Sequence, residues 1–234
     1  MGKIGYGYGS EWHLLRYMGR HRNRLQKQIL STTGGEKINW LDFGFSTKSE
    51  PLEHDTELKG VEFLRDPVVK RKWKGTWPQT GNIPNWDAVG QLVNKNKQEW
   101  LLVEAKANFG ELRSKCDAEL EGNSRKMIVD AMNQAKGSYN VENTSVDNWL
   151  VPYYQFCNRL TMLHFLNEHN VESRLLFIYF YGDKHKEKLK KCPQSAKEWE
   201  PELELMYQRT GIDKKSNLWK RVHTIFISTN PVVI

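Results

Sequence analysis

Apolar residues recur at helical spacing in three parts of the chain. In the first, Ser10 and Glu11 precede the pattern as an N-cap and a first-turn carboxylate, which is typical of a helix start. The apolar positions that follow are Trp12, Leu14, Leu15, Met18, Leu25 and Ile29. They predict one long amphipathic helix to about residue 30. Residues 125–136 and 149–167 are also predicted to be helical, the latter with a broad apolar face.

Runs of branched and aromatic residues predict the strands. They cover residues 38–45, 86–93, 99–107, 174–181 and 221–228. The second and third runs are separated only by the polar residues 94–97, which is the length of a hairpin loop, so we expect them to pair antiparallel. We expect the last two runs to form buried strands.

The order of these elements predicts an α/β fold in which helices pack on a mixed sheet. Two charged segments, at about 46–82 and 183–218, interrupt that order, and we interpret them as insertions on the core. A chain of 234 residues is within the size of one large domain. We therefore expect a single domain over residues 1–234.

Cysteine and histidine positions argue against disulfide or zinc frameworks. The three cysteines are far apart and form no CxxC pair, and the seven histidines lack ligand spacing. The N-terminal residues have no apolar run of the signal-peptide kind, and the longest apolar stretch, Leu175 to Tyr181, is far shorter than the roughly 20 residues of a membrane helix. The sequence therefore predicts a cytoplasmic protein without a membrane partner.

The charge of the chain favours a polyanionic partner. Lys and Arg number 35 against 28 Asp and Glu, a formal charge of +7, and such an excess favours nucleic acid because phosphate contacts release counterions. One segment mixes cations with an aromatic ring and is a predicted nucleic-acid-binding arm. Its residues are Lys70, Arg71, Lys72, Trp73 and Lys74. A solvated charged surface is the open alternative.

Three charged residues of the predicted hairpin converge. Glu104 and Lys106 are two apart on one strand, so their side chains share a face. If residues 94–97 form the loop, Val93 pairs with Gln98. Counting back along both strands then sets Asp87 opposite Glu104, with Cβ atoms about 5 Å apart.

Two carboxylates at that range repel each other, and a divalent cation relieves the repulsion. Mg²⁺ prefers oxygen ligands and keeps several waters, so Asp87, Glu104 and the backbone carbonyl of Ala105 would leave room for water and phosphate, with Mn²⁺ as a substitute ion. The Lys106 ammonium would orient the attacking water. The cluster therefore predicts hydrolysis of a phosphodiester.

Asp87 and the triplet Glu104-Ala105-Lys106 resemble the signature of the PD-(D/E)XK nuclease superfamily, an acid on the second core strand and an E-x-K triplet on the third. The proline usually beside the acid lies three residues earlier, at Pro84. The resemblance implies a restriction-endonuclease-like core of helix, three strands, helix and strand, over about three quarters of the chain. It also implies a Mg²⁺-dependent endonuclease, and we expect its polymer to be DNA.

Members of that superfamily often add a carboxylate from the first helix, and some use a glutamine on a later helix. Glu11 and Gln155 are the residues here that fit, and Arg159 would contact the phosphate backbone. Glu11 could equally stabilise the helix dipole alone. Gln155 and Arg159 could equally lie on the solvated face of an amphipathic helix.

Two other functions stay open, because an E-x-K triplet is common in a chain with 27% charged residues. One is a catalytically silent nucleic-acid-binding module of the same fold. The other is a protein-interaction domain, for which nine Trp residues offer material. The sequence also leaves open whether the polymer is DNA or RNA, and whether two chains pair as a homodimer.

Overall fold

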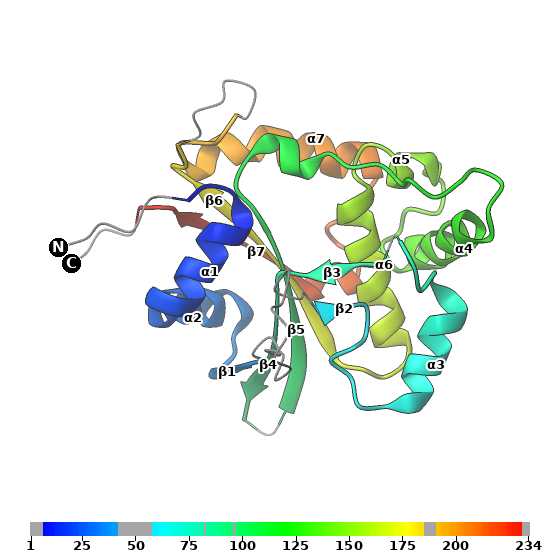
Figure 1. The fold of residues 1–234 in the computed structure, drawn as a ribbon, viewed down its shortest axis with the longest axis horizontal. Helices are drawn as coiled ribbons and strands as arrows, with labels where there is room; N and C mark the ends of the chain where they lie inside the picture. Colours follow the sequence, from blue (N-terminus) through cyan, green and yellow to red (C-terminus); the bar gives the residue numbers. More distant parts are fainter. Residues whose placement is uncertain (1–6, 42–57, 82, 96, 185–190, 231–234) are drawn as a thin grey trace, which may run out of the picture.

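A five-stranded mixed sheet forms the centre of the molecule (Figure 1). The structure is a computed structural model that describes residues 7–41, 58–81, 83–95, 97–184 and 191–230. In sheet order the strands are β1 (Lys37–Trp40), β4 (Ala88–Asn94), β5 (Lys97–Lys106), β6 (Ser173–Tyr181) and β7 (Val222–Ser228). Neighbours from β1 to β5 are antiparallel, and those from β5 to β7 are parallel. The predicted α/β class with a mixed sheet is confirmed.

A second, two-stranded sheet pairs β2 (Leu58–Lys59) with β3 (Asn85–Trp86). The sequence predicted one strand over 86–93, and the structure divides it at Asp87. The segment before Asp87 pairs with β2, and the segment after it pairs with β5. A period-two pattern could not reveal this division, because alternation continues through a bend when both halves are half-buried.

One face of the main sheet is covered by α1 (Ser10–Arg20) and α2 (Arg22–Thr33). The prediction of one continuous helix is wrong, because the chain breaks at His21. No apolar residue lies between Met18 and Leu25, so no packing holds the two halves in line. Helix α1 still buries apolar side chains against β5 and β6, and α2 does so against β1 and β7. Helix α2 ends at Gly34, whose φ of 73° suits glycine. The buried side chains are Leu14, Tyr17, Leu25 and Ile29.

The opposite face is covered mainly by α4 (Asn123–Ser138) and α6 (Tyr154–Glu168), in the main apolar core. The predicted helix at 125–136 corresponds to α4. The one predicted at 149–167 is divided into α5 (Asp147–Leu150) and α6, with Pro152 between them. A proline lacks the amide that a helix interior needs, which accounts for the division.

Two further helices, α3 (Pro67–Thr76) and α7 (Glu200–Thr210), lie inside the segments predicted as insertions. Asp66 caps α3 by accepting the amides of Val68 and Val69. Both helices, with the residues that flank them, contribute to the main core through Val69, Trp73, Trp77, Trp199, Leu203 and Met206. The described parts of both segments therefore belong to the core, while residues 46–57, 82 and 185–190 lie outside the description.

Short 3₁₀ turns complete the described chain. They are η1 (Phe109–Leu112), η2 (Ala196–Trp199) and η3 (Leu218–Arg221). The longest helix in the described ranges, α4, has 16 residues. A search of those ranges finds no helix with the length and apolar character that crossing a bilayer requires.

Candidate active site at the end of strand β5

The hairpin of β4 and β5 has the predicted register. Val93 pairs with Gln98, and the pairing continues to Ala88 and Val103. Asp87 lies one residue further, in the bend before β4, and its amide donates to the Val103 carbonyl at 3.1 Å. Its carboxylate oxygen Oδ2 accepts the amide of Ala105 at 2.6 Å. Asp87 therefore lies beside the end of β5, although it is not part of a strand.

Glu104 carries a buried charge on the face of β5 that packs against α6. Leu102, two residues earlier, belongs to the core on that face, whereas Val103 and Ala105 pack with α1 and α2 on the other. The side chain of Glu104 is only 1% exposed. Such a burial requires partners for both carboxylate oxygens.

Lys106 is one of those partners. Its ammonium group forms an ion pair with Oε1 of Glu104 and donates to Oε1 of Gln155 at 2.8 Å. Gln155 is in the first turn of α6, where its backbone amide donates to the Ser114 hydroxyl at 2.7 Å. The structure thus brings Lys106 and Gln155 together with Glu104.

Arg159 is the other partner. Its Nε donates to Oε2 of Glu104 at 2.8 Å, its Nη1 donates to Oδ1 of Asn158 at 2.8 Å, and its guanidinium lies 5.0 Å from the ring centre of Trp86. Arg159 is 3% exposed, so placing it on a solvated helix face is wrong. It also supplies part of the charge compensation that the sequence interpretation assigned to a metal ion.

The two carboxylates have opposite pKa shifts. Burial, and next the charge of Glu104, raise the pKa of Asp87 to about 7, against the lowering effect of Lys106. Burial alone would raise the pKa of Glu104, but the ion pairs with Arg159 and Lys106 outweigh it and hold that pKa below its usual value. Near neutral pH, Glu104 is therefore ionised while Asp87 is close to its midpoint.

The carboxylates of this cluster have acceptor sites that the described contacts do not use. A carboxylate offers about four lone-pair sites, and the described contacts of Glu104 use two of them. Asp87 accepts one hydrogen bond, at Oδ2. In the described ranges no three His, Cys, Asp or Glu side chains gather as a metal site. A Mg²⁺ ion at this cluster would draw on the two carboxylates, the carbonyl of Ala105 and waters.

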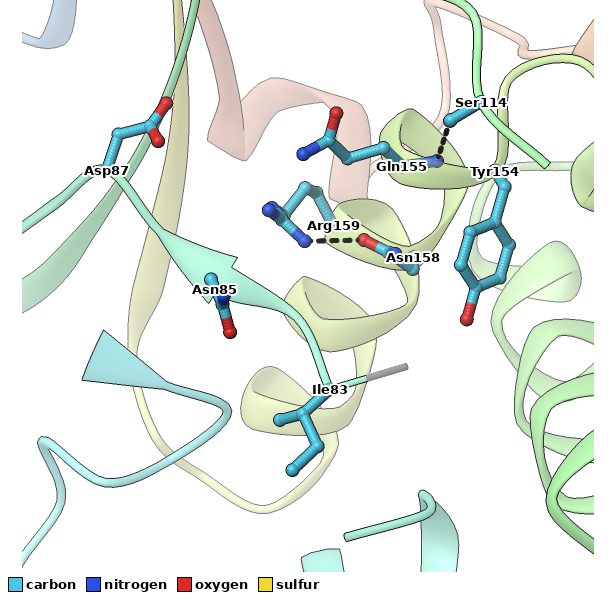
Figure 2. A pocket seen from close by; sticks show the side chains of 8 residues that line it. All are labelled: Ile83, Asn85, Asp87, Ser114, Tyr154, Gln155, Asn158 and Arg159. Carbon is cyan, nitrogen blue, oxygen red and sulfur yellow. Dashed lines mark hydrogen bonds between the residues drawn. The ribbon is translucent and has the colours of Figure 1, made fainter. Parts of the chain in front are cut away.

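A cavity opens beside Asp87, between β3 and the first turns of α6 (Figure 2). Its volume is about 330 Å³, and Gln155 and Arg159 lie on its wall. Two amide side chains, Asn85 and Asn158, also line it, and the sequence interpretation gave neither a role. Asn158 could have been suspected, because it lies at helical spacing from Gln155.

The structure does not connect Glu11 with this cluster. Glu11 is exposed on α1, on the other side of the sheet, and forms no hydrogen bond or ion pair with any described residue. A different acid, Glu111, follows β5 and accepts the amide of Ala107 at 2.7 Å and the side-chain amide of Asn108 at 2.6 Å. The spacing of Asn108 and Glu111 is that of a capping motif, which is the signal that could have revealed it.

The predicted nucleic-acid-binding arm includes one residue that is buried. Trp73 is 2% exposed and stacks on the buried Trp77 at a ring-centre distance of 5.7 Å, so its predicted stacking on bases is wrong. The remaining residues are on the outer side of α3, with Arg71, Lys72 and Lys74 exposed and Lys70 partly so. These four cations could contact a phosphate backbone, or they could contact solvent only.

Comparison of the chain with models of known protein families, with curated protein sequences and with solved structures found no match.

Proposed function

We propose that the protein is a Mg²⁺-dependent nuclease that hydrolyses phosphodiester bonds in DNA. The observation that carries the proposal is the meeting of Asp87, Glu104 and Lys106 at one end of β5, beside a solvent-connected cavity. Two carboxylates that repel each other, with an ammonium group beside them, form a site that a divalent ion and a phosphate would complete.

The topology around the cluster supports the same proposal. An N-terminal helical pair precedes three antiparallel strands, α6 follows them, and β6 then pairs parallel to β5. This is the order that the PD-(D/E)XK resemblance implies, with the acid before β4 and the triplet ending β5. Helices α3, α4, α5 and α7 and strand β7 are additions to that order.

Each side chain then has a defined task. Asp87 and Glu104, with the Ala105 carbonyl, would hold the ion, which supplies Lewis acidity and a bound water of lowered pKa. An ammonium has three N–H donors, and the described contacts of Lys106 use two, so one remains for the attacking water. Gln155 fixes Lys106 in this position through its amide oxygen.

Arg159 would serve the substrate as well as Glu104. Its guanidinium has five N–H donors, of which described contacts use two, and it lies on the cavity wall. A phosphate oxygen arriving beside Asp87 would find these free donors in a water-poor setting, where charge-assisted bonds are strong.

One observation favours a second candidate, the catalytically silent nucleic-acid-binding module. Glu104 already has two cationic partners, Lys106 and Arg159, so its charge is compensated without any metal ion. Such a module would bind DNA in a salt-dependent way and cut it in no metal.

Cleavage assays separate the two. Plasmid and oligonucleotide DNA are incubated with the protein in Mg²⁺, in Mn²⁺ and in EDTA. We expect metal-dependent cleavage, and we expect Asp87→Asn and Lys106→Ala to lower its rate by about 100-fold or more. Asp130→Asn and Lys126→Ala, exposed on α4, are matched controls that should cleave normally. Cleavage by the Asp87 or Lys106 variant at the parental rate, or no cleavage by the parent in either metal, would overturn the nuclease proposal.

A further inference from the structure

The cavity beside Asp87 has little net charge. Arg159 is the cation on its wall, and this cation is already paired with Glu104. Asp87, the acid on the wall, would repel a second anion when ionised. Apart from the place of the scissile phosphate beside Asp87, the wall therefore offers no unpaired cation, and a neutral polar group is the better occupant of the rest of the cavity.

Two hydrogen-bonding groups on the wall lack partners among the described residues. The side-chain amide of Asn85 makes no hydrogen bond with any described residue, although it is partly buried. The Tyr154 side chain is 5% exposed, and its hydroxyl lies near Asn158 and Cys116 without a hydrogen bond of good geometry to either. The Tyr154 hydroxyl is closed off from solvent, so the amide of Asn85 is the group that a ligand carrying donors and acceptors would meet.

The wall includes planar and apolar side chains. Arg159 has one face of its guanidinium over the Trp86 ring and also lines the cavity. Guanidinium planes stack on nucleobases as well as on aromatic side chains. Ile83 and the ring of Tyr154 add apolar surface to the same wall, and Figure 2 shows Asn85 on β3 across from the α6 residues.

We propose that this cavity receives an unpaired nucleobase of the substrate strand, next to the bond that is cut. The proposal rests on the proposed function for the nature of the polymer and the place of the phosphate. Asn85 would bind the edge of the base, since an amide offers a donor and an acceptor side by side. The substrate strand is accordingly single-stranded, or has one base turned out of its stack.

Binding without cleavage tests this assignment. Single-stranded DNA oligonucleotides, each with one abasic site at a different position, are titrated against the full-length protein in EDTA by fluorescence anisotropy. We expect one abasic position to weaken binding by about 5- to 100-fold, and the others to have little effect. No measurable binding, or equal binding of the whole series, would overturn the proposal.

Variants tie the effect to the cavity. In Asn85→Ala, intact DNA should bind more weakly, and the penalty for the critical abasic site should shrink, because the amide that met the base is gone. Asn133→Ala, an exposed amide on α4, is the matched control and should behave as the parent. A full abasic penalty in Asn85→Ala would contradict the proposed contact. Asn85 is the primary target because Asn158 supports Arg159 and its loss would disturb the ion pair.

The two proposals fail separately. Cleavage of DNA in Mg²⁺ without a position-specific abasic effect would support the nuclease proposal and contradict the binding of a base in the cavity. An abasic effect without cleavage in any metal would support the binding of a base in the cavity and contradict the nuclease proposal.

Discussion

Arg159 donates through Nε to Oε2 of Glu104 at 2.8 Å, and both side chains are at most 3% exposed. The two residues are 55 positions apart in sequence and join α6 to β5. An ion pair so deeply buried compensates a charge that the fold could not otherwise accommodate.

Removal of Arg159 should therefore leave Glu104 with an incompletely compensated charge. We expect Arg159→Met to lower the free energy of unfolding by about 3–5 kcal/mol, measured by urea denaturation in EDTA. Glu104→Gln removes the charge itself, so the double variant should be more stable than the sum of the two single effects by about 1 kcal/mol or more. Additive effects in this cycle would show that the pair is not coupled.

The pKa of Asp87 predicts an unusual pH dependence for the metal-free protein. The folded carboxyl has a pKa of about 7 against 3.8 as the ordinary value. Between these values the folded state holds a proton that the unfolded chain has lost, so stability falls as pH rises through this window. We expect a loss on the order of 2–4 kcal/mol between pH 4 and pH 7, with no further loss above.

Asp87→Asn should lack that decrease and be more stable than the parent at pH 8, because asparagine still accepts the Ala105 amide. Asp130→Asn should keep the decrease. Denaturation curves at a series of pH values in EDTA provide the measurement, and parallel profiles for the parent and the Asp87 variant would argue against a raised pKa.

Gln155 is a positioning residue in the proposed reaction. Gln155→Leu should lower kcat by about 10- to 100-fold with little change in KM, since Lys106 loses one of its two acceptors. Stability should change by less than about 1 kcal/mol, because Gln155 is only partly buried. Gln155→Glu retains an oxygen acceptor and should recover part of the rate. A change confined to KM would assign Gln155 to substrate binding instead.

Helix α3 has a buried side, which includes Trp73, and an exposed side, which includes Arg71 and Lys72. Trp73→Ala should destabilise the protein by about 3–5 kcal/mol, because it empties a ring-sized volume in the main core. Arg71→Ala and Lys72→Ala should each change stability by at most about 0.5 kcal/mol. If these cations meet DNA, each substitution should also reduce the slope of log affinity against log salt by about one. An unchanged slope would show that these two cations do not contact DNA.

The sheet and the central cluster could be predicted because local rules govern them. Side-chain alternation places Glu104 and Lys106 on one face, and loop length alone sets the register that brings Asp87 to their side. The break at His21 was missed because Met18 and Leu25, seven positions apart, are still at helical spacing although no apolar residue lies between them. The bend at Asp87 was missed because the alternation of side chains continues through it. Helix α7 was also missed, although Trp199, Leu203 and Met206 have helical spacing within their charged surroundings.

The partner of Glu104 could not be predicted from the pattern of α6. That helix is buried around most of its circumference, including Asn158 and Arg159, so its polar residues do not mark a solvent face. Which of them meets the sheet depends on how α6 is rotated in the core, and this is decided by long-range packing. For the same reason Trp73, beside four cations in sequence, lies inside the protein.

The separation of Glu104 from Arg159 along the chain has a consequence for assembly on the ribosome. Strands β4 and β5 and their short turn emerge first, and they can form a hairpin from local contacts. Helix α6 is synthesised later, so the glutamate stays hydrated until the arginine arrives. Docking of α6 on the nascent hairpin is thus the step that removes this carboxylate from water, and a ribosome paused before residue 159 would hold a growing chain whose central strand still faces solvent.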